Sequence, residues 1–211
     1  MIAVIADDFT GAAELAGISL RYGLSVEVFL NNVTATEADV IVVCTDSRSL
    51  NNTNAKEVTA KVVKNILQLN PSFIYKKIDS VLRGHVLDEI NIQLQQTGLK
   101  KVLILPANPS LGRTISNGEY FINGVRINKT GFATDPEFPI KNSSVVEMIG
   151  NDEVKVLKHT DVLPAKGIAI GEAETVNDMK SWAAVIDNTW MLAGAGDFYT
   201  AIFFITWACK L

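Results

Sequence analysis

The fold of this chain is decided by one stretch near its start, Val4-Ile5-Ala6-Asp7-Asp8-Phe9-Thr10-Gly11-Ala12-Ala13. The apolar run Ile2–Ala6 predicts a buried strand, and the apolar spacing after Thr10 predicts a helix. Open α/β sheets bind ligands at such a junction between a strand end and a helix start. Because neighbouring strand side chains point to opposite faces, we expect only one of Asp7 and Asp8 to cap the helix, while the other faces the crevice. The alternative is two solvated loop acids.

The composition excludes several classes of protein. The 211 residues are 48% hydrophobic and 20% charged, which is typical of a globular protein, and the net charge of −4 argues against nucleic-acid binding. Cys44 and Cys209 have no partner at metal-ligand or disulfide spacing. The chain has no leader-like start, and its longest apolar run, 201–209, is too short to span a bilayer. We therefore expect a cytoplasmic protein that binds no metal and contacts neither membranes nor nucleic acid.

Strands and helices alternate along most of the sequence. The patterns predict strands at 25–30, 39–45, 73–78, 101–105, 154–157, 167–170 and 190–193, and helices at 56–69, 86–97, 176–186 and 197–210. This alternation predicts an α/β fold with a doubly wound, mostly parallel sheet whose functional loops share one edge. The dipeptide Asn123-Gly124, between two apolar and polar runs, predicts a β-hairpin inserted over about 114–130. We expect one domain over 1–211.

The second informative stretch is Lys76-Lys77-Ile78-Asp79-Ser80-Val81-Leu82-Arg83-Gly84-His85. We expect one of the two strand lysines to face the crevice. Arg83 lies just before a predicted helix start, where a guanidinium, free N–H groups and the helix dipole suit a carboxylate or phosphate. The alternative is that Arg83 forms a structural pair with Asp7 or Asp8. His85 is either a proton carrier or, as we favour, a helix-start histidine that makes one backbone bond.

Two further signals are weaker. Arg113 is a second candidate contact for an anion on the same edge. Gly194-Ala195-Gly196 precedes the last helix, but such a short glycine pattern is more often a tight turn than a phosphate loop. The sequence lacks the glycine-rich, lysine-containing loop that cradles nucleotide phosphates, so we expect no ATP site in this chain.

Several motifs in a fixed order give the sequence its resemblance to a known family. They are residues 6–12 and 76–85, then Pro106-Ala107-Asn108-Pro109 with Gly112-Arg113-Thr114, followed by Asn123-Gly124, Thr130 and Asp135-Pro136. Together they resemble the N-terminal domain of the four-carbon acid sugar kinases. That family phosphorylates threonate, erythronate or their 3-oxo forms; its N-terminal domain holds the sugar acid, and a C-terminal domain holds ATP. Val81 departs from the family, which usually has Thr there.

The resemblance implies the substrate-binding half of a kinase that transfers a phosphoryl group to a hydroxyl of a four-carbon sugar acid. Arg83 would hold the substrate carboxylate, Asp8 and Asp79 would bind hydroxyls, and Asp8 is the candidate general base. The full set of expected substrate-binding residues is Asp7, Asp8, Thr10, Gly11, Lys77, Asp79, Ser80, Arg83, Gly84, His85 and Arg113. ATP and Mg²⁺ are implied for the family enzyme, but we expect neither the nucleotide domain nor turnover in this chain alone.

Two other functions remain open at this point. The first is a non-catalytic sugar-acid-binding module or remnant of a kinase. The second is a phosphoribosyltransferase, whose diphosphate-sugar loop also has an apolar run followed by Asp-Asp and Thr-Gly, although that loop normally lies well inside the chain.

The last predicted helix, 197–210, is apolar nearly all round. Phe198, Ile202, Ile205 and Cys209 would cover the sheet, and we expect the second stripe, Tyr199, Phe203 and Trp207, to be exposed. Exposed aromatic patches of this kind favour association. The sequence therefore predicts that the chain needs either a C-terminal nucleotide domain or a second copy, in a two-fold dimer, to cover this helix. The alternative is that the hairpin near Asn123-Gly124 folds over the stripe.

Overall fold

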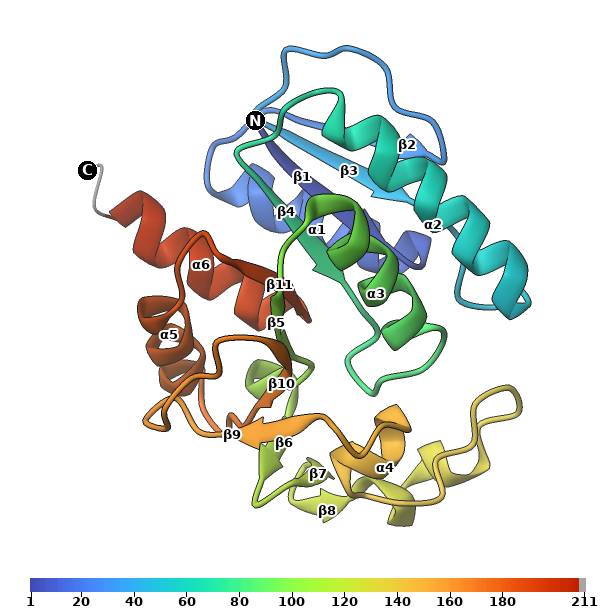
Figure 1. The fold of residues 1–211 in the computed structure, drawn as a ribbon. Coiled ribbons are helices and arrows are strands. Elements are labelled where there is room, and N and C mark those ends of the chain that lie inside the picture. The colour runs from blue at the N-terminus through green and yellow to red at the C-terminus, as the bar shows by residue number, and fades with distance from the viewer. Residues whose placement is uncertain (209–211) are drawn as a thin grey trace.

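A computed structural model describes the backbone of residues 1–208 and the side chains of residues 1–204. A central sheet is covered on one face by α2 (Asn52–Leu67) and α3 (Val86–Thr97), as Figure 1 shows. Its other face packs against α1 (Phe9–Arg21), α5 (Val176–Val185) and α6 (Gly196–Ala208). The predicted α/β fold is confirmed.

The sheet has eight strands, and every ladder in it is parallel. The strands lie in the order β2-β3-β1-β4-β11-β5-β10-β9. Their bounds are β1 (Ile2–Ala6), β2 (Val26–Leu30), β3 (Val40–Cys44), β4 (Phe73–Lys77), β5 (Lys101–Leu105), β9 (Lys155–Leu157), β10 (Gly167–Gly171) and β11 (Trp190–Gly194).

The order of the strands places the crevice of the fold. After β1 the chain moves toward β2, and after β4 it moves in the opposite direction, toward β5. β1 and β4 are neighbours, paired from Ile2 with Phe73 to Ala6 with Lys77. Doubly wound sheets bind ligands at the carboxyl ends of strands where the direction reverses. In this protein that point lies where β1 and β4 end.

The strands form because both of their faces are buried. β3 is buried at all five positions, as the uninterrupted apolar run of its sequence predicts. Alternate residues of β1 belong to two separate cores: Ala3 and Ile5 pack toward α2, and Val4 and Ala6 pack toward α1. The sheet therefore has an apolar layer on each side.

The predicted hairpin is a three-stranded antiparallel sheet instead. Its strands are β6 (Arg113–Ser116), β7 (Glu119–Ile122) and β8 (Val125–Arg126). Asn123-Gly124 forms the predicted turn, and a second Asn-Gly pair, Asn117-Gly118, forms the turn between β6 and β7; all four residues have positive φ. The short helices η1 (Pro109–Leu111), η2 (Ile127–Lys129), η3 (Gly131–Thr134) and α4 (Val145–Ile149) flank this sheet (Figure 1).

The expected exposure of the last helix is wrong. Tyr199 and Phe203 are buried, because the Tyr199 hydroxyl hydrogen-bonds Ser19 of α1 at 2.9 Å and the Phe203 ring stacks on Tyr22 at 5.4 Å. Helix α1 and its C-cap residue Tyr22, not the inserted hairpin, contact these two aromatic rings. Among the large apolar side chains of α6 that the structure describes, that of Phe204 is exposed. The side chains of Ile205, Trp207 and Cys209 lie outside the described residues, and the argument for a dimer through this stripe no longer holds.

One negative finding concerns membranes. Among the helices of the described residues, none has the length and apolarity that crossing a lipid bilayer requires.

Candidate functional site

Three loops converge at the carboxyl edge of the sheet, and Arg48 lies at their centre. Its Nε and Nη2 donate to the two oxygens of Asp7 at 2.7 and 3.1 Å. Its Nη1 lies 2.8 Å from Oδ2 of Asp8 and 3.5 Å from Oδ1 of Asp79. One guanidinium from the loop after β3 therefore joins the acids that follow β1 and β4. Burial opposes its charge, but the hydrogen bonds and charge of Asp7 raise the pKa of Arg48 above its usual value.

Asp7 and Asp8 have different roles, as the sequence predicts. Asp8 caps α1, since its Oδ1 accepts a hydrogen bond from the Gly11 N–H at 2.8 Å. Asp7 does not face an open crevice as expected: its side chain is 6% exposed and is held by Arg48. Thr10 is exposed in the first turn of α1, beside the cap. The interpretation of two solvated loop acids is therefore wrong.

Arg83 pairs with acids other than those considered from the sequence. Its Nε and Nη2 form a fork with Asp79 at 3.0 and 2.9 Å, and its Nη1 donates to Asp135 at 3.0 Å. Burial of Asp79 opposes its charge, but the hydrogen bonds of Arg83 and the charge of Arg48 lower the pKa of that carboxyl. The charge of Arg83 is thus already matched within the protein.

The loop after β4 is tightly turned around Asp79. Its Oδ2 also accepts from the backbone N–H groups of Val81 and Arg83, each at 3.2 Å. Leu82, within this turn, has φ of +64°, a conformation that costs energy for a bulky side chain. Val81, where the family usually has Thr, is buried, and with Arg83 it lines a cavity of about 410 Å³ beside the segment 138–148.

Arg113 is the arginine of this edge whose charge has no acidic partner among the described residues. Its guanidinium donates to the Ser80 hydroxyl, and its Cζ lies 5.9 Å from the centre of the Phe132 ring. The Cζ of Arg83 lies 5.6 Å from the centre of the same ring. Phe132 therefore contacts two guanidinium groups, of which only that of Arg83 has a carboxylate partner.

The two strand lysines point to opposite faces of the sheet, as expected. Lys76 is fully buried, and its Nζ lies 2.6 Å from Oε2 of Glu89 on α3. Lys77 points toward α1, where its Nζ lies 3.4 Å from Glu14 and donates to the Ile78 carbonyl at 2.9 Å. A Cβ on Gly11 would lie 3.2 Å from the Nζ of Lys77, so Lys77 is near Gly11 and the Asp8 cap, but its charge is already paired with Glu14.

Gly84 and His85 shape the edge through close contacts with Arg48 and with the Leu50 carbonyl. Gly84 has φ of +86°, and a Cβ there would lie 3.1 Å from Cγ of Arg48, so glycine lets the arginine approach closely. The Nε2 of His85 lies 2.6 Å from the Leu50 carbonyl oxygen, which is the single backbone bond that we favoured.

Four residues of this edge were not among the expected site residues: Arg48, Tyr120, Phe132 and Asp135. The Tyr120 hydroxyl donates to the Ser80 carbonyl at 2.8 Å and so ties the inserted sheet to the loop after β4. A sequence signal for Arg48 existed, because the polar run Asp46-Ser47-Arg48-Ser49 follows a strand that is buried on both faces. Phe132 lies in η3 and Asp135 follows that short helix, and their position depends on how the segment after the inserted sheet folds back.

The glycine loop before α6 does not fit a nucleotide phosphate. The Ala195 N–H donates to the Leu105 carbonyl at 3.1 Å, and the Asp197 N–H donates to Asn108 Oδ1 at 2.9 Å. A Cβ on Gly196 would lie 2.2 Å from Oε1 of Glu14, so an acid already occupies the space next to this loop. Within the described part of the chain, no cluster of three or more His, Cys, Asp or Glu residues is arranged to hold a metal ion.

Comparisons with known proteins show the family of this chain. The sequence profile described as "sugar-binding N-terminal domain" matches residues 2–202. A D-threonate kinase of Salmonella typhimurium is 34% identical over 149 residues, and a 3-oxo-tetronate kinase of Brucella melitensis is 33% identical over 156 residues. These matches cover 69% and 70% of this chain but 35% and 36% of the relatives, so the chain spans about a third of their length.

A solved structure shows the same fold. A Bordetella bronchiseptica protein, crystallised with bound citrate as a domain-swapped dimer, matches with a TM-score of 0.82 and 24% identity, over 99% of this chain and 57% of its own. The profile match and the two kinases argue against a phosphoribosyltransferase. The chain belongs to the family of sugar-binding N-terminal domains of the four-carbon acid sugar kinases.

Proposed function

We propose that this chain binds a four-carbon sugar acid at the carboxyl edge of its sheet and presents a hydroxyl of that acid for phosphorylation. The relatives named as D-threonate and 3-oxo-tetronate kinases support this substrate class. ATP and Mg²⁺ would be held outside the described residues, because the loop before α6 is occupied by its own hydrogen bonds and by Glu14. The part played by this chain is then to position the acceptor, which is the main requirement of phosphoryl transfer.

The observation that carries this proposal is the pair of arginines on Phe132. Both guanidinium groups lie over the same ring, but only one of them is balanced by carboxylates of the protein. Arg83 has Asp79 and Asp135, while Arg113 has only the Ser80 hydroxyl and the ring. A substrate carboxylate would balance the positive charge of Arg113. The planar guanidinium of an arginine can also form two parallel hydrogen bonds with a carboxylate. We therefore assign the main carboxylate contact to Arg113 rather than to Arg83.

Asp8 is the acid that we assign to the substrate hydroxyl. Its side chain is 23% exposed, whereas those of Asp135, Asp79 and Asp7 are 16%, 7% and 6% exposed. Each Asp8 oxygen has one protein partner, the Gly11 N–H or Arg48, and a carboxylate oxygen can accept more than one hydrogen bond. Asp8 can therefore accept the hydroxyl proton while Arg48 holds the carboxylate in place.

Titration calorimetry of the full chain with D-threonate and with D-erythronate tests the proposal. Loss of one partner of a desolvated charge pair costs about 2–5 kcal/mol, so Arg113→Gln is expected to weaken binding by about thirtyfold or more. Arg126→Gln is the matched control, because Arg126 lies on the same inserted sheet with an exposed side chain. Equal affinity of the wild type and Arg113→Gln for both sugar acids would contradict the assignment.

A further inference from the structure

Four buried polar side chains connect the loop after β3 with β4 and with α3. The loop supplies two of them, β4 one and α3 one: Thr45, Ser47, Lys76 and Glu89. Each is at most 1% exposed. Ser47 directly precedes Arg48, the residue that joins the acids of the candidate site. A fully paired network of buried polar groups can fix the place of the residues next to it.

The carboxylate of Glu89 links two separate segments of this cluster. Its Oε2 lies 2.6 Å from the Nζ of Lys76, and its Oε1 accepts a hydrogen bond from the Ser47 hydroxyl at 2.5 Å. The Thr45 hydroxyl oxygen lies 2.8 Å from the Ser47 hydroxyl oxygen and 3.0 Å from the carbonyl oxygen of Ala6 at the end of β1. Glu89 of α3 therefore holds the loop after β3 in place between β1 and β4.

The backbone beside Ser47 leads directly to the candidate site. The N–H groups of Ser47 and Arg48 both donate to the Asp7 carbonyl, at 2.9 and 3.2 Å. The Arg48 side chain then reaches the carboxylates of Asp7 and Asp8. A displacement of Ser47 would move the origin of this side chain, and the Asp8 carboxylate would lose the cation that holds it.

Stability alone is a weak reason for the charges in this cluster. Replacing a buried ion pair by apolar side chains of similar volume is often neutral or stabilising, so Lys76 and Glu89 are not needed to fill the space between β4 and α3. An apolar side chain, however, could not accept the hydrogen bond of the Ser47 hydroxyl. The feature that distinguishes Glu89 from an apolar residue of its size is therefore its contact with the loop that carries Arg48.

We propose that Glu89 is a positioning residue: through Ser47 it fixes Arg48, and through Arg48 it fixes the carboxylate of Asp8. The consequence for the substrate rests on the proposed function, in which Asp8 accepts a hydrogen bond from a hydroxyl of the sugar acid. The place of Arg48 does not depend on a bound substrate, so the two parts are measured separately.

The main test compares Glu89→Leu with Glu89→Gln, each combined with Lys76→Met. Both double variants remove the buried charges, but only the amide keeps a hydrogen bond to Ser47, because a hydroxyl can both donate and accept. Urea denaturation is expected to show that the leucine variant is the more stable, since a buried amide that lacks some of its partners costs free energy. A role in stability alone therefore predicts the opposite order from a positioning role.

The exchange of the Arg48 Nε proton with water, followed by NMR of the ¹⁵N-labelled chain, reports on the place of Arg48. The loss of the signal in Arg48→Lys assigns it. Because this N–H donates to Asp7, its exchange is expected to be slow in the wild type and in the glutamine variant, and about fivefold faster or more in the leucine variant. Ser47→Ala removes the same hydrogen bond by a single change and is expected to speed the exchange equally. The control is Ser72→Ala, since the exposed Ser72 hydroxyl donates to the Met1 carbonyl at the other edge, and it is expected to leave the exchange unchanged.

Calorimetry with D-threonate tests the consequence for the substrate. The leucine double variant and Ser47→Ala are expected to bind it about threefold to tenfold more weakly than the wild type, the worth of one hydrogen bond between Asp8 and a substrate hydroxyl. The glutamine double variant and Ser72→Ala are expected to bind it as the wild type does.

Two results would overturn the role of Glu89. They are equally slow exchange of the Arg48 proton in the leucine and glutamine double variants, and exchange rates that follow the stability of the variants. Equal affinity of the wild type and Ser47→Ala for D-threonate would overturn the extension to Asp8. The absence of D-threonate binding by the wild type would contradict the proposed function, and the exchange rates would then confirm or overturn the role of Glu89 on their own.

Discussion

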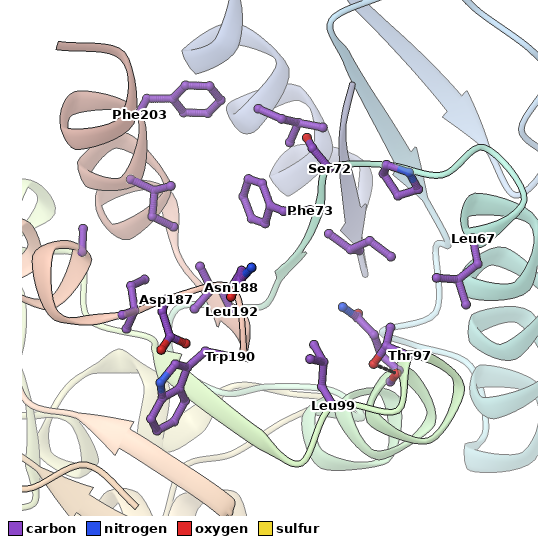
Figure 2. A pocket seen from close by; sticks show the side chains of 17 residues that line it. Leu67, Ser72, Phe73, Thr97, Leu99, Asp187, Asn188, Trp190, Leu192 and Phe203 are labelled. Atoms are coloured by element: carbon purple, nitrogen blue, oxygen red, sulfur yellow. Dashed lines mark hydrogen bonds between the residues drawn. The ribbon is translucent and has the colours of Figure 1, made fainter. Parts of the chain in front are cut away.

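The two edges of the sheet differ in what holds them together. At the carboxyl edge, Arg48 and Arg83 bind four aspartates, and β4 and β11 are paired. At the amino edge the same two strands diverge around an apolar cavity (Figure 2). The first edge is preorganised by matched charges and the second is open for lack of packing. The comparison shows that matched charges connect the loops after β1 and β4, whereas the charge of Arg113 at the same edge has no acidic partner among the described residues.

The largest effect is expected where charge is buried beneath the carboxyl edge. Glu89→Ala leaves Lys76 fully buried without its partner, which is expected to lower the free energy of unfolding by about 3–5 kcal/mol, as measured by urea denaturation. Asp88→Ala on the same helix breaks a pair whose side chains are 45% and 36% exposed, so it is expected to cost about 1 kcal/mol or less. A double variant, Lys76→Met with Glu89→Leu, is expected to recover most of the loss. Similar losses for Glu89→Ala and Asp88→Ala would contradict this account.

A matched pair of leucines compares packing between the filled and the open parts of the sheet. Leu103 and Leu192 face each other across β5 and β11, but only Leu192 lines the cavity. Leu103→Ala is expected to cost about 3–5 kcal/mol, and Leu192→Ala about 2–3 kcal/mol, because the wall of a cavity already lacks part of its contacts. Thermal or urea unfolding measures both. A larger loss for Leu192→Ala than for Leu103→Ala would show that the amino edge is as well packed as the rest.

The smallest effect concerns acid pH at the carboxyl edge. The pKa of Asp79 is lower in the folded chain than its unfolded value of about 3.9. Its contribution to stability is therefore complete above that value and is lost as the pH falls through the folded pKa. The stability difference between the wild type and Asp79→Asn is expected to shrink between pH 5 and pH 3. Asp152→Asn, at an exposed position, serves as the control, and a difference that is constant across this range would contradict the assignment.

The sequence predicted the sheet well because its signals are local. Runs such as Val40–Cys44 and closing residues such as Gly98, which has a left-handed φ of +75°, indicate where strands and helices end. The three-stranded insertion was predicted only in part, because Asn117-Gly118 carries the same turn signal as Asn123-Gly124 and was not used. The burial of Tyr199 could not be predicted, since it depends on Ser19 of a helix that is distant in sequence.

The candidate site was harder to predict than the fold. The expected residues do lie on one edge, because the carboxyl ends of parallel strands meet there. Ion pairs between loops, however, decide which arginine lacks a carboxylate partner. Asp135 pairs with Arg83, and no described acid pairs with Arg113. Arg48 pairs with acids from two other loops. A single sequence gives residue types and their order, but not these partners.

The central claim is that Arg113 recognises the carboxylate of a four-carbon sugar acid, and a comparison of D-threonate with D-threitol tests it most directly. The two compounds share their remaining hydroxyls, and D-threitol has an alcohol in place of the carboxylate. Calorimetry of the wild type is expected to show about thirtyfold or greater preference for D-threonate, and Arg113→Gln is expected to lose that preference while Arg126→Gln keeps it. Equal affinity of the wild type for the two compounds, or a preference that persists in Arg113→Gln, would contradict the claim.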